Sequence, residues 1–376
     1  MIITKFSNKS ATLQSRYPRR NSGLDEVMWL EQEASSSNAT AHVTRMVLSF
    51  DVNYDELHYK GINLDSSTYT ASLKLFNTNG GGNHDNVKTL SCAVLNKVAQ
   101  NGEWNAGKGR VADYTTTEKD ASWTNRYGTQ ATWSTAAGVT SPGGAILAGS
   151  PIANTNYDST KDLVFTVTDA TLLWTNADIA NANNGFLIYQ FEDTDTNIDQ
   201  EQSKYEFFSS NTHTIYQPRL ELGFDDSSYA TSSTQLPIGL TTHNLDEYYA
   251  YLKSNNGSYK HGTIASFDIN IRPKYTAKTY ANTASANKEY VFETGVLTYA
   301  IIDAKTGERV IDFDRNNTKL SCSSTTGHFF NIWTDSLMKE RYYSIQIGVG
   351  AISPNHATQF EPRKVFTIKD TFKITR

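Results

Sequence analysis

Four aromatic residues form the most suggestive chemical pattern in this sequence. They fall within about 30 residues that are rich in Gly, Ser, Thr and Asn. Flat rings exposed together stack on sugar rings through apolar contact, so the group is a candidate saccharide-binding platform. The alternative is that the indoles fill one end of a β-sandwich core. The four residues are Trp104, Trp123, Tyr127 and Trp133.

An acidic segment further along resembles the start of a calcium loop. Asp193, Asp195 and Asn197 alternate as the first oxygen ligands of such a loop do. However, Ile198 stands where the sharp turn needs Gly, and Lys204 stands where a bidentate Glu would close the shell. The segment is therefore not an EF-hand. A looser calcium site on the rim of a sandwich stays open, and the bland alternative is an acidic, solvated loop.

Other catalytic and cofactor patterns are missing from the sequence. There is no Gly-x-Ser-x-Gly elbow and no phosphate-cradling Gly-x-x-x-x-Gly-Lys segment. The eight His residues are scattered through polar segments without zinc-site spacing, and each is expected at the surface. Cys92 and Cys322 lie far apart in sequence and form no disulfide framework, so each is expected to be a small buried hydrophobe or a half-exposed thiol. The sequence favours a non-enzymatic protein with no cofactor beyond the candidate calcium. A depolymerising enzyme with two cleft carboxylates remains a disfavoured alternative.

The elements that must position these residues are mostly short strands. Apolar and polar residues alternate in many runs that Asn, Gly, Asp and Ser clusters separate. One helix is expected over Asn244–Lys253, where Asn244 and Glu247 fit a capping box and apolar residues recur at helical spacing. A short helical turn is also expected near Thr168, and a hairpin turn at Ala304–Gly307. The strand runs include Met46–Val52, Ala71–Phe76, Leu163–Val167, Phe186–Phe191, Pro218–Phe224, Ile264–Arg272, Val296–Asp303, Phe329–Trp333 and Tyr342–Val349.

The predicted fold is therefore all-β, with two sandwiches and one short linking helix. Residues 1–225 are expected to form a jelly-roll sandwich, and residues 226–260 a linker that contains the helix. Residues 261–376 carry six or seven strand patterns in about 115 residues, which is typical of an immunoglobulin-like sandwich.

An ordered series of motifs runs through the first 225 residues. It includes Arg45–Asp51, Ala71–Phe76, Thr132-Trp133, Asn183–Ile188 and the closing Pro218-Arg-Leu220. In order and spacing, the series resembles the DNRLRE-type, carbohydrate-binding-module-like domain. The resemblance implies a jelly roll and allows binding to a polysaccharide. Asn211 stands where that family often has an acid, so no binding residue is carried over from it.

The last 115 or so residues are similar to immunoglobulin-like domains in structural proteins of tailed bacteriophages. Ala265–Pro273, Tyr299–Thr306 and Ile311–Asp314 carry this resemblance. It implies a virion structural protein of the neck, collar, tail or baseplate that docks in many copies onto symmetric partners. The runner-up function is a carbohydrate-binding module that attaches a virion or a complex to host polysaccharide.

The composition agrees with both functions. The chain of 376 residues has a net charge of −5, which argues against a general nucleic-acid binder. Only 19% of its residues are charged, and it has 21 Tyr, which suits broad docking surfaces. No apolar run is long enough for a membrane span, and the first 20 residues lack the apolar core of a secretory signal. The expected location is thus a virion assembled in the host cytoplasm. The short basic run Arg16, Arg19 and Arg20 could contact an acidic partner, but a solvated face is the simpler interpretation.

Overall fold

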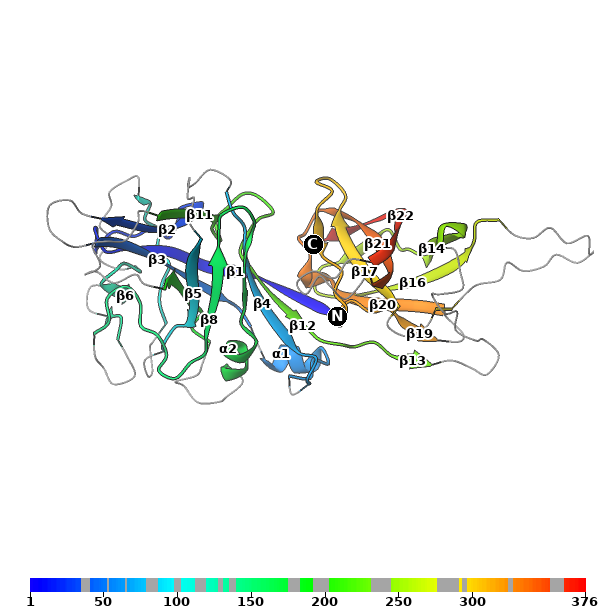
Figure 1. Cartoon of the computed structure of the whole chain (residues 1–376), viewed down its shortest axis with the longest axis horizontal. Helices are drawn as coiled ribbons and strands as arrows, with labels where there is room; N and C mark the ends of the chain where they lie inside the picture. The colour runs from blue at the N-terminus through cyan, green and yellow to red at the C-terminus, as the bar shows by residue number, and fades with distance from the viewer. Residues whose placement is uncertain are drawn as a thin grey trace, which may run out of the picture. The chain divides into compact units, whose positions relative to one another are not determined.

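The structure is a computed structural model built almost wholly of β-strands, which confirms the all-β prediction (Figure 1). It divides into two compact units. The N-terminal unit comprises Lys5–Leu64 and Thr70–Leu222. The C-terminal unit comprises Gly223–Arg376 together with Met1–Thr4 and Asp65–Tyr69. The structure describes residues 1–34, 41–52, 54–64, 66–78, 87–97, 103–111, 120–127, 131–134, 140–174, 183–191, 203–230, 245–275, 291–292, 296–323, 327–351 and 362–376.

One large, branched sheet forms the frame of the N-terminal unit (Figure 1). Its strands are β1 (Ile2–Gln14), β2 (Val27–Ala34), β3 (Ala41–Phe50), β4 (Thr70–Leu75), β5 (Lys88–Val94), β8 (Ile152–Tyr157), β9 (Leu163–Thr166), β10 (Phe186–Gln190), β11 (Ser203–Phe208) and β12 (Arg219–Gly223). The main path runs β8-β5-β10-β3-β1-β12-β4-β9, while β2 joins β3 to β11. The two ends of the path approach each other, because Thr155 Oγ1 in β8 donates to the carbonyl of Val164 in β9 at 3.1 Å. The sheet is therefore nearly closed.

The central strands of this sheet are buried on both faces. Leu13 of β1 and Val47 of β3 pack into a core cluster on one face of the sheet. Met46 and Leu48, the two neighbours of Val47 in β3, are fully buried on the other face. Strand β1 even buries Thr12 and other small polar residues. A strand covered on both sides loses the alternation that marks a half-exposed strand, which is why β1 has no clear sequence signal.

Small elements connect these strands. The helices are α1 (Tyr54–Tyr59) and α2 (Thr168–Leu173), and α2 confirms the helical turn expected near Thr168. Strands β6 (Asn125–Tyr127) and β7 (Ala131–Thr132) form a separate two-stranded ribbon within the loop-rich segment that carries the tryptophans.

The C-terminal unit is a β-sandwich of two five-stranded sheets. One sheet has the order β13-β19-β20-β16-β14, and the other has the order β15-β22-β21-β17-β18. Rings from the two sheets meet in one core: Phe267 lies 4.9 Å from Phe372, and Tyr299 lies 4.1 Å from Phe330, measured between centroids. The strands are β13 (Tyr229–Ala230), β14 (Tyr248–Ser254), β15 (Ser258–Lys260), β16 (Ile264–Pro273), β17 (Leu297–Asp303), β18 (Arg309–Ile311), β19 (Ser321–Ser323), β20 (Gly327–Trp333), β21 (Tyr342–Ala351) and β22 (Pro362–Thr375).

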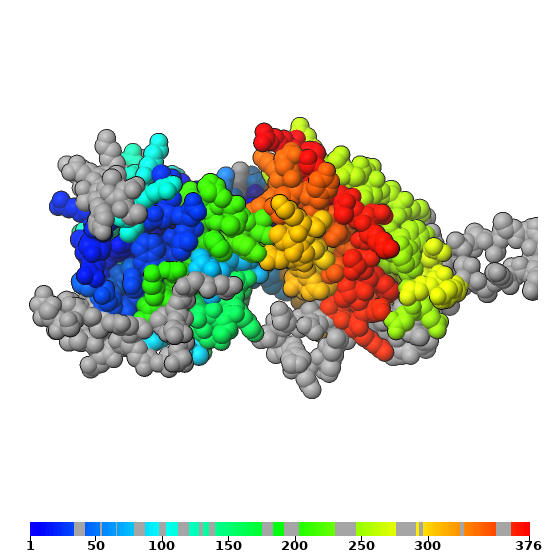
Figure 2. Space-filling view, turned by 90° about the horizontal axis from the view of Figure 1, so that it is seen from above, coloured from blue at the N-terminus to red at the C-terminus, as the bar shows by residue number. Residues whose placement is uncertain are grey.

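The last strand, β22, organises the second sheet of the sandwich. It pairs antiparallel with β21 and parallel with β15, from Ser258 opposite Lys373 to Lys260 opposite Thr375. In Figure 2 the red residues of β22 lie on the visible face of this unit, beside yellow-green residues. The hairpin between β17 and β18 confirms the turn expected at Ala304–Gly307, where Gly307 takes a left-handed φ of 77°.

The helix predicted over Asn244–Lys253 is wrong. Only Leu245–Glu247 forms a single 3₁₀ turn, η3, and Tyr248–Ser254 is strand β14. Tyr248, Ala250 and Leu252 point into the sandwich core, while Tyr249 is exposed on the opposite face. A run of tyrosines fits a pleated surface well, and pairing with β16 outweighs the local capping signal.

Candidate functional site

The three tryptophans of the aromatic group lie inside the N-terminal unit. Trp104, Trp123 and Trp133 are only 2%, 7% and 1% exposed and share one core cluster with residues of β1, β3 and β10. The indole N–H of Trp104 donates to the carbonyl of Asn184 at 2.9 Å, and that of Trp133 donates to the carbonyl of Ser122 at 2.8 Å. These indoles therefore present no exposed face on which a sugar could stack. This placement corresponds to the core alternative.

Tyr127 differs from the three tryptophans because its side chain is exposed and it is not part of their core cluster. Its side chain is 56% exposed at the end of β6, so the structure does not bring it together with the indoles as one flat platform. The sugar-binding prediction for the complete set of four residues therefore does not match their positions.

Asn21 holds the loops around the tryptophans in place. Its amide nitrogen donates to the carbonyls of Ala106 and Ala121, both at 2.7 Å. Its amide oxygen accepts from the backbone N–H of Gly23 and of Gly109, at 3.1 and 2.8 Å. This side chain is fully buried, and all four of its hydrogen-bonding positions are used. It ties the start of the chain to the segment around residues 106–121.

A different group of polar and aromatic residues borders the tryptophan cluster on the same sheet. We call it the amide face. Its members come from four adjacent strands and the residue after β10, and Tyr189 packs directly against the tryptophan cluster. The row that crosses the four strands spans three inter-strand spacings, or about 14 Å. The amide face consists of Arg45, Thr89, Ser91, Asn154, Asn156, Tyr189 and Phe191.

Hydrogen bonds orient the two amides of this face. Ser91 Oγ donates to Asn154 Oδ1 at 2.7 Å, and Thr89 Oγ1 donates to Asn156 Oδ1 at 2.9 Å. Both Asn side chains are exposed, so their N–H donors are directed by these bonds while remaining in contact with solvent. Phe191 is 58% exposed beside them.

A cation lies at the other end of the amide face. The guanidinium of Arg45 lies 5.8 Å from the centre of the Tyr189 ring and 5.1 Å from that of the buried Trp123. It also donates to the carbonyl of Gly143 at 3.3 Å. The amide face therefore combines aligned donors with aromatic surface, which is the chemistry that recognises hydroxyl-rich ligands.

The structure describes the two cysteines but not the candidate calcium ligands. The candidate calcium ligands Asp193, Asp195 and Asn197 lie outside the described residues. Within the described ranges, no group of three or more His, Cys, Asp or Glu is placed to hold a metal ion. Cys92 and Cys322 are both free and buried, which is the first of the two expected states. Burial raises the pKa of both thiols, that of Cys322 to about 11, so both are protonated at neutral pH.

His328 corrects the expectation that every His lies at the surface. Its side chain is 2% exposed in β20, and its Nε2 accepts the backbone N–H of Phe292 at 3.0 Å. Burial lowers the pKa of His328 to about 4, so the ring is neutral at physiological pH. The position follows from strand alternation, because Phe330, two residues on, also faces the core.

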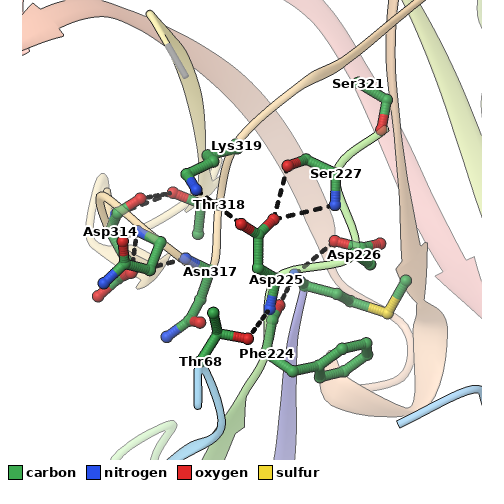
Figure 3. Close-up of polar contacts among 12 residues, drawn as sticks. Thr68, Phe224, Asp225, Asp226, Ser227, Asp314, Asn317, Thr318, Lys319 and Ser321 are labelled. Carbon is green, nitrogen blue, oxygen red and sulfur yellow. Dashed lines mark hydrogen bonds and ion pairs between the residues drawn. The ribbon is translucent and has the colours of Figure 1, made fainter. Parts of the chain in front are cut away.

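Asp225 is the centre of a polar cluster in the C-terminal unit (Figure 3). Its carboxylate accepts from Lys319 Nζ at 2.6 Å and from the Oγ and N–H of Ser227 at 2.6 and 3.0 Å. Its own N–H donates to Thr68 Oγ1 at 3.3 Å. Burial acts to raise the pKa of Asp225, but the bonds from Lys319 and Ser227 outweigh it and hold the pKa below its ordinary value. The carboxylate is already occupied, so its role is to join three chain segments.

Strand β14 carries two tyrosines on its outer face, of which Tyr249 is exposed and Tyr251 is half-buried. The rings of Tyr249 and Tyr251 are 6.2 Å apart and nearly parallel, at 14°. Arg272 of β16 lies opposite Tyr249 in the register, and its guanidinium is 5.8 Å from the Tyr249 ring and 5.7 Å from the Tyr251 ring. Tyr249 is 41% exposed. We call these three residues the tyrosine–arginine site.

Sequence reasoning missed both surfaces for identifiable reasons. The tyrosine–arginine site was hidden by the helix assignment, although the alternation from Tyr248 to Leu252 was a readable period-two signal. For the amide face, Asn154 and Asn156 alternate within Ile152–Tyr157, but a polar strand of this kind resembles a loop. No local signal joins them to residues of β5 and β10, because only sheet pairing brings those strands together.

Comparison with protein-family models and with curated proteins finds no match for this chain. In the described part of the chain, no helix is both long and apolar enough to cross a membrane.

Proposed function

We propose that this protein is a non-enzymatic structural component of a tailed-phage virion, located in the neck, collar, tail or baseplate. It acts through protein–protein interfaces in a symmetric, multi-copy assembly and is assembled in the host cytoplasm. The proposal includes a jelly-roll arrangement for the N-terminal unit and an immunoglobulin-like arrangement for the C-terminal unit.

The tyrosine–arginine site is the observation that carries this proposal. Tyr and Arg are enriched among the residues that dominate binding energy in protein interfaces. Here two Tyr and one Arg stand together on the outer face of a sheet whose inner face is anchored in the core. A rigid sheet holds such side chains at little further entropic cost on binding.

The test is to look for the chain in purified virions. Mass spectrometry is expected to detect it in many copies per particle, and cryo-electron microscopy is expected to place it at one fixed, symmetric position. Its absence from purified particles would refute the proposal.

The amide face favours a second candidate function, which is binding to host polysaccharide. Asn154 and Asn156 offer oriented N–H donors to sugar oxygens, and Tyr189 and Phe191 offer apolar ring surface. This candidate does not depend on the buried tryptophans.

A glycan array with the whole chain tests this second candidate. Binding that Asn154→Ala and Asn156→Ala abolish, with unchanged melting, is expected. The control is Asn105→Ala, which alters another exposed Asn whose amide contacts Asp120. Binding that survives both amide-face substitutions would place the sugar site elsewhere. If the array retains no glycan at all, this candidate function is refuted.

A further inference from the structure

Among the described residues, no carboxylate lies at ion-pair distance from Arg272. The residue is half-buried, and its guanidinium contacts the rings of Tyr249 and Tyr251. Four other arginines each have such a carboxylate within 3.2 Å. These pairs are Arg16–Glu33, Arg219–Glu221, Arg309–Asp312 and Arg341–Asp303.

We propose that the tyrosine–arginine site receives a carboxylate from an acidic protein partner. This inference rests on the proposed function, and it names the chemistry that the partner supplies. A planar guanidinium presents paired N–H donors that match the two oxygens of a carboxylate. The carboxylate of the partner would bind Arg272 beside the rings of Tyr249 and Tyr251.

No described acid forms an ion pair with Arg272, although the exposed Glu247 lies two residues before Tyr249 and its backbone carbonyl accepts from the N–H of Lys274 at 2.7 Å. Along the outer side of β16 the next acid is Asp268, four residues away, which corresponds to about 13 Å along a strand. A partly desolvated cation without an acceptor is unfavourable, and a bound carboxylate would relieve that cost. The two flanking rings also restrict the guanidinium before binding, so less side-chain freedom is lost when the partner arrives.

A protein is the occupant that the geometry favours over a sugar. The site stands on the outer face of a sheet, where a protein surface can cover a broad area around one Arg and two Tyr. Small ligands instead bury most of their surface in concave sites lined by several polar groups. An acidic saccharide is therefore an outcome of the test and not part of the proposal.

Calorimetric titration of the whole chain tests the inference with defined probes. The probes are a short peptide of alternating Glu and Thr, its counterpart with Gln in place of Glu, and a galacturonate oligomer. The Glu peptide is expected to bind, and the Gln peptide to bind at least about tenfold more weakly. Arg272→Gln is expected to lower the affinity for the Glu peptide by about tenfold, and Tyr249→Ala by several-fold.

Arg309→Gln is the matched control. The guanidinium of Arg309 also lies near a ring, 4.8 Å from that of Phe313, but it is already paired with Asp312. Its substitution is expected to leave peptide affinity unchanged. Thermal melting of each variant establishes that the fold is intact.

Three results would overturn the inference: no binding of the Glu peptide, equal binding of the Glu and Gln peptides, or full affinity in Arg272→Gln. Binding of galacturonate without the peptide would also overturn it and assign a saccharide to the site. The proposed function fails separately. If the protein is found in virions but does not bind the Glu peptide, the proposed function stands and the carboxylate site is refuted. If the protein binds the peptide but is absent from virions, the carboxylate site stands and the proposed function is refuted.

Discussion

Replacing Trp133 distinguishes a core tryptophan from a sugar-binding one. The side chain is 1% exposed, and its indole N–H bonds the carbonyl of Ser122. Truncating a buried Trp to Ala costs about 3–5 kcal/mol, through lost burial and the cavity that remains. In a unit of about 200 residues, each kcal/mol lowers the melting temperature by about 2–4 °C, so Trp133→Ala is expected to lower it by about 10 °C.

The assay is thermal melting followed by circular dichroism, with two companion variants. Trp133→Phe keeps most of the apolar volume but removes the hydrogen bond, so a smaller loss of about 1–2 kcal/mol is expected. Tyr127→Ala changes an exposed ring and should stay within about 0.5 kcal/mol of the parent. If Trp133→Ala melts like the parent and instead loses binding to a glycan, the core assignment of this indole is refuted.

Two further substitutions test buried polar groups. Asn21→Ala should lower the free energy of unfolding by about 3 kcal/mol, because it leaves buried carbonyl and N–H groups without partners. Chemical denaturation measures this loss. A loss below about 1 kcal/mol would show that the loops do not depend on the Asn21 side chain. His328 has a folded pKa of about 4 against 6.5 in its ordinary state, so its contribution to stability is complete above pH 6.5 and lost as pH falls toward 4. The free energy of unfolding changes by about 3 kcal/mol over this pH range. His328→Gln should flatten this part of the stability–pH curve. An unchanged slope in the variant would count against a buried, neutral His328 ring.

The strands with one buried face could be read directly from the sequence. From Ala265 to Ile271 in β16 and from His328 to Ile332 in β20, every second residue is buried, so alternation marks both as strands. The tight turn at Gly307 was readable for a similarly local reason, since Gly tolerates the left-handed backbone that the turn requires. The all-β class follows from many such local signals.

Local signals misled where tertiary contacts outweighed them. Asn244 and Glu247 carry a good capping pattern, yet the segment that follows pairs with β16 because Ala250 and Leu252 bury their side chains in the sandwich. His328 was expected at the surface because polar neighbours surround it in sequence. In β20 alternate side chains face the core, and His328 occupies one of these inward-facing positions.

By itself, the sequence determined the all-β class, the half-exposed strands and the short turns, because these depend on the period of nearby residues. Only the tertiary structure decided where the chemistry lies. It buried Trp104, Trp123 and Trp133 in one core cluster with residues of β1, β3 and β10, and it assembled the amide face from strands more than a hundred residues apart. It also brought Arg272 beside two tyrosines. Such groupings depend on strand order and register, which arise from long-range pairing and burial and leave no local pattern in the chain.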